Sequence, residues 1–420
     1  MKIAIISQPW EGALPPSSAI PIWTYQVARR LAKSHEVLVY ARKKETQQTH
    51  EYDEGVHYIL TKRTLDGWML KVLNPLGRFF PARRPMFASL PYYFFYVVQV
   101  AQDLRKRQPD IVHLYNFPQF VSLLRVFLPR TRIVLHMQCD WLGQLDQAML
   151  ARHLAKADLI LGVTEFITNN VRRRFPQIAE RCQTVFNGVD FETFTSLNGR
   201  RPCPGPDPTD RPGKRLLFVG RLSPEKGIHI LLEAFALVAQ RYPQVHLDVV
   251  GPQWEAPSEF VVTLSDDEKV KGLARFYDGQ GYFAHLQQRV TPEIADRVTF
   301  VGFVPAAEVV CSYQSADVFV FPSVWDEPFG MPVVEAMAAE VPVVATRSGG
   351  IVELIEHGTT GLLVNPDDAP ALAEALVSLL ENDQLCQEMG RAGRQRVDRL
   401  FRWERVVDSL EQHYTRLVSL

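Results

Sequence analysis

The chain has 420 residues, more than one hydrophobic core normally serves, so we expect two domains. A hydrophobic fraction of 46% and a charged fraction of 22% are ordinary for a globular protein, and a net charge of −1 argues against nucleic-acid binding. Five scattered cysteines without a CxxC pair argue against disulfides and a zinc site, and they indicate a reducing compartment.

The first residues show no secretory signal, because Met1 to Ser7 is typical of a short strand. The longest apolar stretch, 87–101, contains Pro91 and Gln99 and is too short to span a bilayer. We therefore expect a cytoplasmic protein.

The N-terminal half alternates short apolar runs with helical patterns, which is typical of an α/β domain with a parallel sheet. We assign this doubly wound domain to residues 1–197. The predicted strands are Lys2 to Ser7, Val37 to Ala41, Ile111 to Tyr115, Ile133 to His136 and Leu159 to Val163, and the predicted helices are Thr24 to Lys33 and Tyr92 to Arg107.

Residues 198–213 are rich in proline, glycine and charge, and we interpret them as an interdomain linker. A second α/β series occupies 214–402, with 254–292 as a long, partly helical insertion. Its predicted strands are Leu216 to Val219, Leu247 to Val250, Val298 to Val301, Val318 to Phe321 and Val341 to Ala345, and its predicted helices include Ile228 to Arg241 and Pro370 to Glu381. Two such domains would place a ligand between them, at the carboxyl ends of the strands.

Charge is distributed unevenly between the halves. Residues 1–196 hold 25 Lys and Arg against 16 Asp and Glu, giving +9, and the remainder holds 21 against 31, giving −10. Residues 62–107 combine nine basic with two acidic residues and many aromatic ones, which suits peripheral contact with an anionic membrane surface. The alternative is that 92–99 forms an ordinary helix packed on the sheet.

Glu327 and Glu335 are separated by the seven residues Pro-Phe-Gly-Met-Pro-Val-Val, directly after an apolar strand. Pro332 favours a helix start, with Glu335 in its first turn, so the amides of Phe329, Gly330 and Met331 should form an anion site. The glutamates would then bind hydroxyls on either side of the anion, as in a nucleotide sugar. Alternatively, Glu335 only stabilises the helix dipole.

The segment 218–227, Phe-Val-Gly-Arg-Leu-Ser-Pro-Glu-Lys-Gly, runs from a strand end toward a helix. A lysine in a first helical turn is disfavoured by the dipole, so Lys226 is expected to serve an anion together with Arg221. The alternative is a solvated pair or a bridge from Lys226 to Glu225. Phe303 follows another strand and is a candidate to pack on a base.

These motifs resemble those of the retaining GT-B glycosyltransferases of family 4, the glycosyl transferases group 1, through E-x7-E, G-R-L-x-x-x-K-G and the turn Asn187-Gly188-Val189-Asp190. The resemblance implies two Rossmann-like domains, with the helix 403–420 returning to the first. It implies that Arg221 and Lys226 neutralise the leaving diphosphate, and that Glu335 holds the ribose and Glu327 the sugar. His136, which ends a strand, would touch the transferred sugar, and Asn187 is a weaker candidate of the same site.

One position departs from the family. Where paired glycines commonly follow the first strand, this chain has Ser18-Ala19. The Ser18 hydroxyl can still donate to a phosphate oxygen, but the close backbone approach that glycine allows is lost.

The resemblance thus implies transfer of a hexose from a nucleotide sugar, in polysaccharide biosynthesis. A UDP-sugar is the expected donor and a GDP-sugar the second candidate, in the order of their frequency in the family. The acceptor would be a glycan or a lipid-linked glycan. No cofactor or metal is expected, because no DxD triad or His/Asp cluster is present and cationic side chains can replace a metal. Two rivals remain: a nucleotide-sugar binding protein without turnover, and an epimerase or phosphorylase on the same scaffold.

Overall fold

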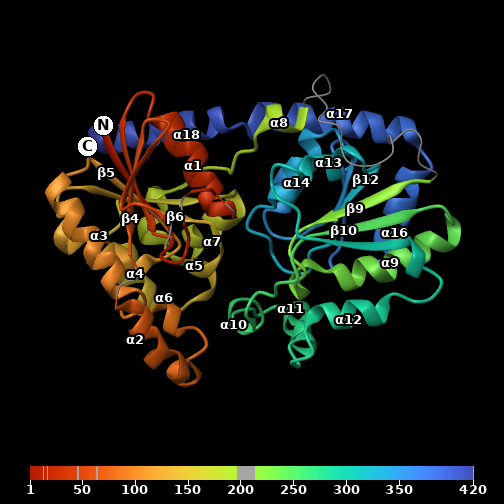
Figure 1. Ribbon diagram of the computed structural model, residues 1–420, viewed down its shortest axis with the longest axis horizontal. Helices are drawn as coiled ribbons and strands as arrows, with labels where there is room; N and C mark the ends of the chain where they lie inside the picture. The colour runs from red at the N-terminus through yellow and green to blue at the C-terminus, as the bar shows by residue number, and fades with distance from the viewer. Residues whose placement is uncertain (13, 17, 45–46, 63–64, 196–212, 420) are drawn as a thin grey trace. The chain divides into compact units, whose positions relative to one another are not determined.

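The computed structural model (Figure 1) describes residues 1–12, 14–16, 18–44, 47–62, 65–195 and 213–419. These residues form two compact units, Met1–Gly188 with Trp403–Leu420, and Val189–Arg402. Apart from Gly213, the predicted linker 198–213 lies outside the described residues. The predicted boundary at 197 lies there too, so it stays a prediction.

The first unit is built on an eight-stranded sheet of order β3-β4-β2-β1-β5-β6-β7-β8, parallel except for the β3–β4 pair at one edge. Its inner strands are nearly continuous apolar runs because helices cover both faces, whereas the edge strands β3 and β8 are polar and less buried. The strands are β1 (Lys2–Ile6), β2 (Glu36–Arg42), β3 (His50–Asp53), β4 (Val56–Thr61), β5 (Ile111–Tyr115), β6 (Arg132–Met137), β7 (Leu159–Gly162) and β8 (Cys182–Thr184).

Helices of the first unit follow these strands. They are α1 (Ala19–Leu31), α2 (Asp66–Leu73), α3 (Phe94–Arg107), α4 (Pro118–Phe127), α5 (Trp141–Gln144), α6 (Gln147–Leu154), α7 (Glu165–Arg174) and α18 (Trp403–Ser419), with 3-10 turns η1 (Asn74–Phe79), η2 (Met86–Ala88) and η3 (Pro176–Arg181). α1 and α18 pack side by side on one core, and Arg30 of α1 donates to Glu404 of α18 at 2.9 Å (Figure 1).

The second unit is built on a six-stranded parallel sheet of order β11-β10-β9-β12-β13-β14. The strands are β9 (Arg215–Val219), β10 (His246–Val250), β11 (Val298–Gly302), β12 (Val318–Phe321), β13 (Val343–Thr346) and β14 (Leu362–Val364). Because β9 lies between β10 and β12, the strand order reverses there, and the loops after β9 and β12 leave the same sheet edge as neighbours. Such a reversal is where ligands bind in open α/β sheets.

Helices of the second unit cover both sheet faces. They are α8 (Phe191–Thr195), α9 (Ile228–Arg241), α10 (Ser258–Val261), α11 (Glu268–Gly272), α12 (Tyr282–Arg289), α13 (Val309–Gln314), α14 (Met331–Ala338), α15 (Ile351–Leu354), α16 (Ala369–Leu380) and α17 (Asp383–Leu400), with 3-10 turns η5 (Pro224–Lys226), η6 (Leu273–Phe276) and η7 (Ala295–Arg297). α9 and α16 share one apolar core with the sheet, and α12 of the insertion packs against α9 (Figure 1).

The predicted fold class, two doubly wound Rossmann-like sheets, is confirmed. The sequence prediction omitted β3, β4, β8 and β14. It was also wrong about disulfides: Cys311 is disulfide-bonded, whereas Cys139, Cys182 and Cys386 are free. The scatter of the cysteines along the sequence does not show which of them the fold brings together, so it could not exclude a bridge.

Candidate active site

In the second unit the two sequence motifs lie against each other. Gly227 adopts φ +71°, and a Cβ there would lie 2.0 Å from the carbonyl oxygen of Pro322, so only glycine permits this approach. The amide of Val324 donates to the carbonyl oxygen of Glu225 at 2.9 Å, and Ser323 Oγ lies 3.0 Å from the same oxygen. The loop after β9 is therefore fixed on the loop after β12.

Lys226 and Glu327 form an ion pair at this junction. The Lys226 Nζ donates to Glu327 Oε1 at 2.6 Å, and the Ser323 hydroxyl donates to the same oxygen at 2.6 Å. Burial tends to raise the pKa of Glu327, but the Lys226 charge and these hydrogen bonds together lower it below its ordinary value. The ring centroids of Phe321 and Trp325 each lie 5.6 Å from Lys226 Nζ. Lys226 is thus a nearly buried cation paired with Glu327, not with Glu225.

Arg221 is held from two directions. Its Nε and Nη2 donate to Glu225 Oε1 at 3.0 and 2.7 Å, and the buried Glu225 carboxylate also accepts a bond from the Ser223 hydroxyl. The guanidinium carbon lies 5.2 Å from the ring centroid of Trp254, which belongs to the insertion. Nη1 of Arg221 donates to no other residue that the structure describes, so it can serve a ligand.

The helix start predicted from Pro332 is present: α14 begins at Met331, with Gly330 as N-cap at φ +107°. A Cβ on Gly330 would lie 2.5 Å from the Ile351 side chain, so this turn depends on glycine. Within the described residues, the amides of Gly330 and Met331 donate no hydrogen bond, which leaves them able to bind an anion. Phe329 is buried, and its ring meets that of Phe401 at 5.8 Å.

Glu335 lies in the second turn of α14, because the helix starts at Met331; its predicted place in the first turn was wrong. The helix dipole falls off within the first turn, so it does not account for this residue. Burial raises the pKa of Glu335, and the hydrogen bond from the Tyr313 hydroxyl to Oε2, at 2.7 Å, partly opposes that rise. Phe303, directly after β11, is 68% exposed, so its ring is available for stacking.

In the first unit His136 and Asn187 belong to one polar network. His136 is fully buried and bonds His113 through Nδ1 at 3.2 Å and Gln138 through Nε2 at 3.3 Å. Gln138 and Asn187 exchange two hydrogen bonds, and His113 bonds the Tyr414 hydroxyl of α18 at 2.7 Å. Burial lowers the pKa of His113 to about 3 and that of His136 well below its usual value, so both rings are neutral. Contact of His136 with a sugar stays a prediction.

Ser18 is exposed at the N-cap of α1, and its hydroxyl donates to Glu11 Oε1 at 2.9 Å. Burial raises the pKa of Glu11 to about 7, and the bond from Ser18 only partly offsets that rise. The other carboxylate oxygen, Oε2, is buried without a hydrogen-bond partner among the described residues. Ser18 therefore serves Glu11 here, and its contact with a phosphate stays a prediction.

Sequence reasoning missed several of these partners. Glu225 was considered only as a partner of Lys226, although its spacing of four residues from Arg221 was a usable signal. Tyr313, Ser323 and Glu11 lie in segments whose local pattern carries no sign of their role, because each meets its partner only through the tertiary fold.

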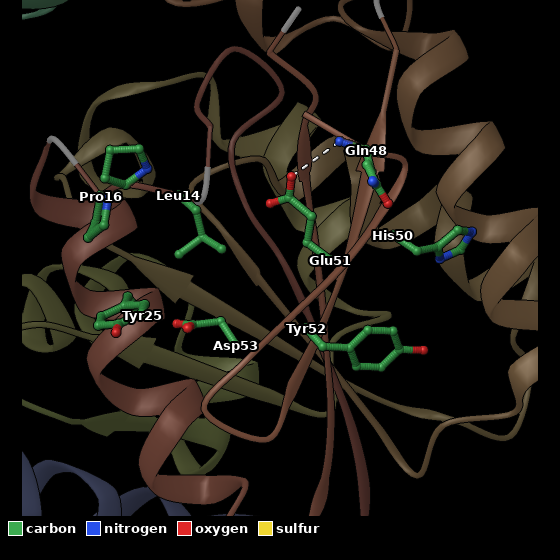
Figure 2. A pocket seen from close by; sticks show the side chains of 9 residues that line it. Leu14, Pro16, Tyr25, Gln48, His50, Glu51, Tyr52 and Asp53 are labelled. Carbon is green, nitrogen blue, oxygen red and sulfur yellow. Dashed lines mark hydrogen bonds between the residues drawn. The ribbon is translucent and has the colours of Figure 1, made fainter. Parts of the chain in front are cut away.

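Two of the hollows of the first unit differ in charge, and a third, of about 700 Å³, is lined by Arg84, Leu90, Ser122, Ala148, Met149, Arg152, His153 and Lys156. One, of about 610 Å³, is lined by Leu14, Pro15, Pro16, Tyr25, Gln48 and 50–53. Figure 2 shows Tyr25 and Asp53 facing each other there, while the Tyr52 ring points away and Glu51 accepts a bond from the Gln48 amide at 3.2 Å. The second, of about 250 Å³, is lined by Pro9, Arg42, Thr61, Lys62, Asp66, Gly67, Leu70, Lys71, Tyr93 and Tyr96. The first is acidic and the second basic.

Among the residues that the structure describes, no group of three or more His, Cys, Asp or Glu side chains is arranged to hold a metal ion. In the same part of the chain, every helix is too short or too polar to cross a bilayer.

Two Rossmann-like units, with arginine, lysine and free amides at the strand-order reversal of the second, define the architecture of a GT-B glycosyltransferase. Residues 207–396 match the family model of glycosyl transferases group 1, and residues 21–193 match that of glycosyltransferase family 4. The chain belongs to this glycosyltransferase family and is a transferase of the GT-B fold.

Curated relatives agree with this assignment. The chain is 28% identical to spore coat protein SA of Bacillus subtilis, over 99% of this chain and 100% of that protein. It is 32% identical to D-inositol 3-phosphate glycosyltransferase of Corynebacterium urealyticum, over 63% of this chain and 58% of that protein.

Solved structures agree on the fold. Anabaena Alr3699/HepE in complex with UDP and glucose superposes with a TM-score of 0.68 at 21% identity, covering 99% of each chain. Sucrose-phosphate synthase of Thermosynechococcus elongatus superposes with a TM-score of 0.71 at 21% identity, covering 100% of each.

Proposed function

We propose that this protein is a retaining hexosyltransferase that moves a hexose from a nucleoside-diphosphate sugar to a glycan or lipid-linked glycan. The observation that carries the donor assignment is the junction of the two loops in the second unit. There Lys226 and Arg221 lie on the loop fixed against the one that leads to the free amides of Gly330 and Met331. Two cations and two amides at one strand-end edge suit a diphosphate.

Each cation keeps donors for that diphosphate. A lysine ammonium has three N–H groups, and Glu327 takes one from Lys226. Arg221 keeps both N–H groups of Nη1 while Glu225 fixes its other edge. Because both side chains are already fixed, little conformational entropy remains to be lost when they meet the charge that develops on the leaving group. This pre-arrangement supports a reaction in which side chains, rather than a metal, neutralise the departing diphosphate.

Glu327 and Glu335 are proposed to bind hydroxyls on either side of the diphosphate. Glu327 is ionised beside Lys226, so it can accept a hydrogen bond from a sugar hydroxyl through Oε2. Glu335 Oε2 accepts a hydrogen bond from the Tyr313 hydroxyl, and Oε1 can accept one from a ribose hydroxyl. Among the described side chains of the second-unit site, none is placed as a general base, which supports same-face substitution in which the leaving phosphate accepts the acceptor proton.

UDP is the proposed nucleotide, because the similar Alr3699/HepE is described in complex with UDP and with UDP-glucose. GDP is the second candidate. The exposed ring of Phe303 is proposed to stack on the base. A cytoplasmic location and membrane contact through 62–107 also stay predictions.

A thermal-shift screen of UDP- and GDP-sugars tests the donor. A ligand at about 100 times its dissociation constant adds about 2.7 kcal/mol, which is a clear shift. Product analysis then separates the rivals. A binding protein shows the thermal shift but forms no product. An epimerase isomerises the donor when no acceptor is present, and a transferase needs an acceptor or hydrolyses the donor slowly. Anomeric configuration of the product, read by NMR, tests retention, and an inverted product contradicts it.

A further inference from the structure

The basic hollow of the first unit lies at the carboxyl ends of two parallel strands. Arg42 ends β2 and Lys62 directly follows β4, its neighbour in the sheet, while Lys71 comes from α2, the helix after β4. Loops at the carboxyl ends of the strands are where open α/β sheets bind ligands. This hollow therefore lies at the ligand-binding edge of the sheet, although the strand order reverses at β1 and β5 and not at β2 and β4. None of its lining residues belongs to the donor site of the second unit.

The carboxylate of this hollow already has a structural role. Asp66 is almost fully buried, and its two oxygens accept the amides of Phe95 at 2.9 Å and Tyr96 at 2.8 Å at the start of α3. Thr61 donates to the carbonyl oxygen of Ala41 at 3.3 Å. These two polar side chains of the hollow therefore serve the fold.

Arg42, Lys62 and Lys71 make no side-chain hydrogen bond or ion pair with another residue that the structure describes. A solvated lysine on a convex surface needs no partner, but three cations and one carboxylate around one concavity leave an excess of positive charge, which an anion can neutralise. The hollow of about 250 Å³ corresponds to roughly eight water volumes, which admits a phosphate ester.

We propose that this hollow binds a phosphate group carried by the acceptor, with Arg42, Lys62 and Lys71 as its ligands. This rests on the proposed function, because it names the acceptor class of the same transferase. The acidic hollow of Figure 2, with Glu51 and Asp53, repels such a group and serves as the internal contrast.

The phosphate has two possible sources, a soluble sugar or polyol phosphate and a phospholipid headgroup. α2 supplies a reason to test the second: Leu65, just before it, and Trp68 and Val72 on it are 62%, 69% and 51% exposed. These residues are spaced by three and four positions, so they form one apolar face beside the hollow.

The first measurement is calorimetric titration of the full chain with inorganic phosphate, in the presence of saturating UDP. The Lys62→Ala/Lys71→Ala variant is compared with Lys33→Ala/Lys106→Ala. The control removes two exposed lysines of the same unit that line neither hollow. We expect phosphate affinity to fall by roughly tenfold or more in the hollow variant, since each lost charge-assisted bond contributes that much, and to change less than about twofold in the control.

The second measurement is co-sedimentation with vesicles of phosphatidylglycerol or of phosphatidylcholine. Inorganic phosphate binding that depends on Lys62 and Lys71 supports the proposal with a soluble acceptor. Binding to phosphatidylglycerol vesicles alone, lost in the same variant, supports it with a lipid headgroup. If neither probe binds, or if both pairs of variants bind alike, the proposal is overturned.

A Lys226→Ala variant separates this proposal from the donor assignment. Phosphate binding that survives in this variant while UDP binding is lost shows that the phosphate binds outside the donor site, and its dependence on Lys62 and Lys71 places it in the basic hollow. If wild-type protein fails to bind UDP but binds phosphate through Lys62 and Lys71, the donor assignment fails and the anion site stands.

Discussion

The cations of the two units are prepared for anions in opposite ways. In the second unit Lys226 and Arg221 are fixed by the buried carboxylates Glu327 and Glu225. In the first unit the cations of the basic hollow have no such partner among the described residues. Paired cations are rigid and accurately placed, which favours stabilising charge in a transition state, whereas unpaired ones adapt to a group that only has to be held. The difference suits a donor site and an acceptor site respectively.

The largest effect is expected from Lys226. Lys226→Met removes a pre-placed charge, so kcat/KM should fall by about 2.7–4 kcal/mol of barrier, or roughly 100- to 1000-fold. It also leaves Glu327 buried without its cation, which should lower the free energy of unfolding by about 3–5 kcal/mol. Donor turnover and denaturant unfolding measure the two effects.

The double variant Lys226→Met/Glu327→Gln is the matched control. It removes both charges, so most of the stability should return while turnover stays low. If turnover also returns with stability, Lys226 acts only through folding, and the contrast between the two units collapses.

Glu11 should make the stability of the first unit depend on pH. Its folded pKa of about 7 lies above the ordinary 4.5, so the protonated carboxyl favours the folded state. That stability is fully present below about pH 4.5 and is lost as the pH rises to about 7, by at most about 3 kcal/mol. Glu11→Gln should therefore raise the urea midpoint at pH 8 and leave it nearly unchanged at pH 4.5. Glu180→Gln, at an exposed position, should do neither; equal behaviour of the two variants would show that Glu11 ionises normally.

The second unit was more predictable from sequence than the first. Its motifs are local: Gly227 and Gly330 allow turns that the spacing of the motifs already places, and Pro332 indicates the start of α14 within one residue. The pairing of Lys226 with Glu327 was not predictable, because 101 positions separate them and only the parallel order of β9 and β12 brings them together.

In the first unit, contacts between residues far apart in the sequence limited the prediction even more. His136 could be assigned to a strand end, but its burial depends on His113 and on Tyr414, 301 residues after His113. The hollow of Arg42, Lys62 and Lys71 has no motif, since its members come from two strand ends and a helix, and β4 itself was not predicted. A resemblance could identify the donor residues and could not locate this hollow.

Asp66 tests whether the carboxylate of the basic hollow serves the fold. Asp66→Ala removes both acceptors at the start of α3 and should cost about 1–2 kcal/mol of unfolding free energy. Asp66→Asn keeps one acceptor and should cost less. Because Asn also removes the negative charge, it should strengthen phosphate binding in the calorimetric assay. Weaker phosphate binding in a folded Asp66→Asn protein would contradict the proposed geometry of the hollow.

The smallest effect is expected from substitution of Trp254, which tests whether Arg221 is held in place before the donor binds. Its ring lies against Arg221 and is 54% exposed, and a cation–π contact at such a site contributes about 0.5–1 kcal/mol. Trp254→Leu should therefore raise KM for the donor, or lower kcat/KM, by about two- to fivefold. Trp254→Phe keeps an aromatic face and should recover part of that loss, while Gln253→Ala, at the exposed position next to it in the loop, should change nothing. If the Leu and Phe variants lose donor affinity equally, the Trp254 ring does not hold Arg221, and Glu225 alone fixes the guanidinium.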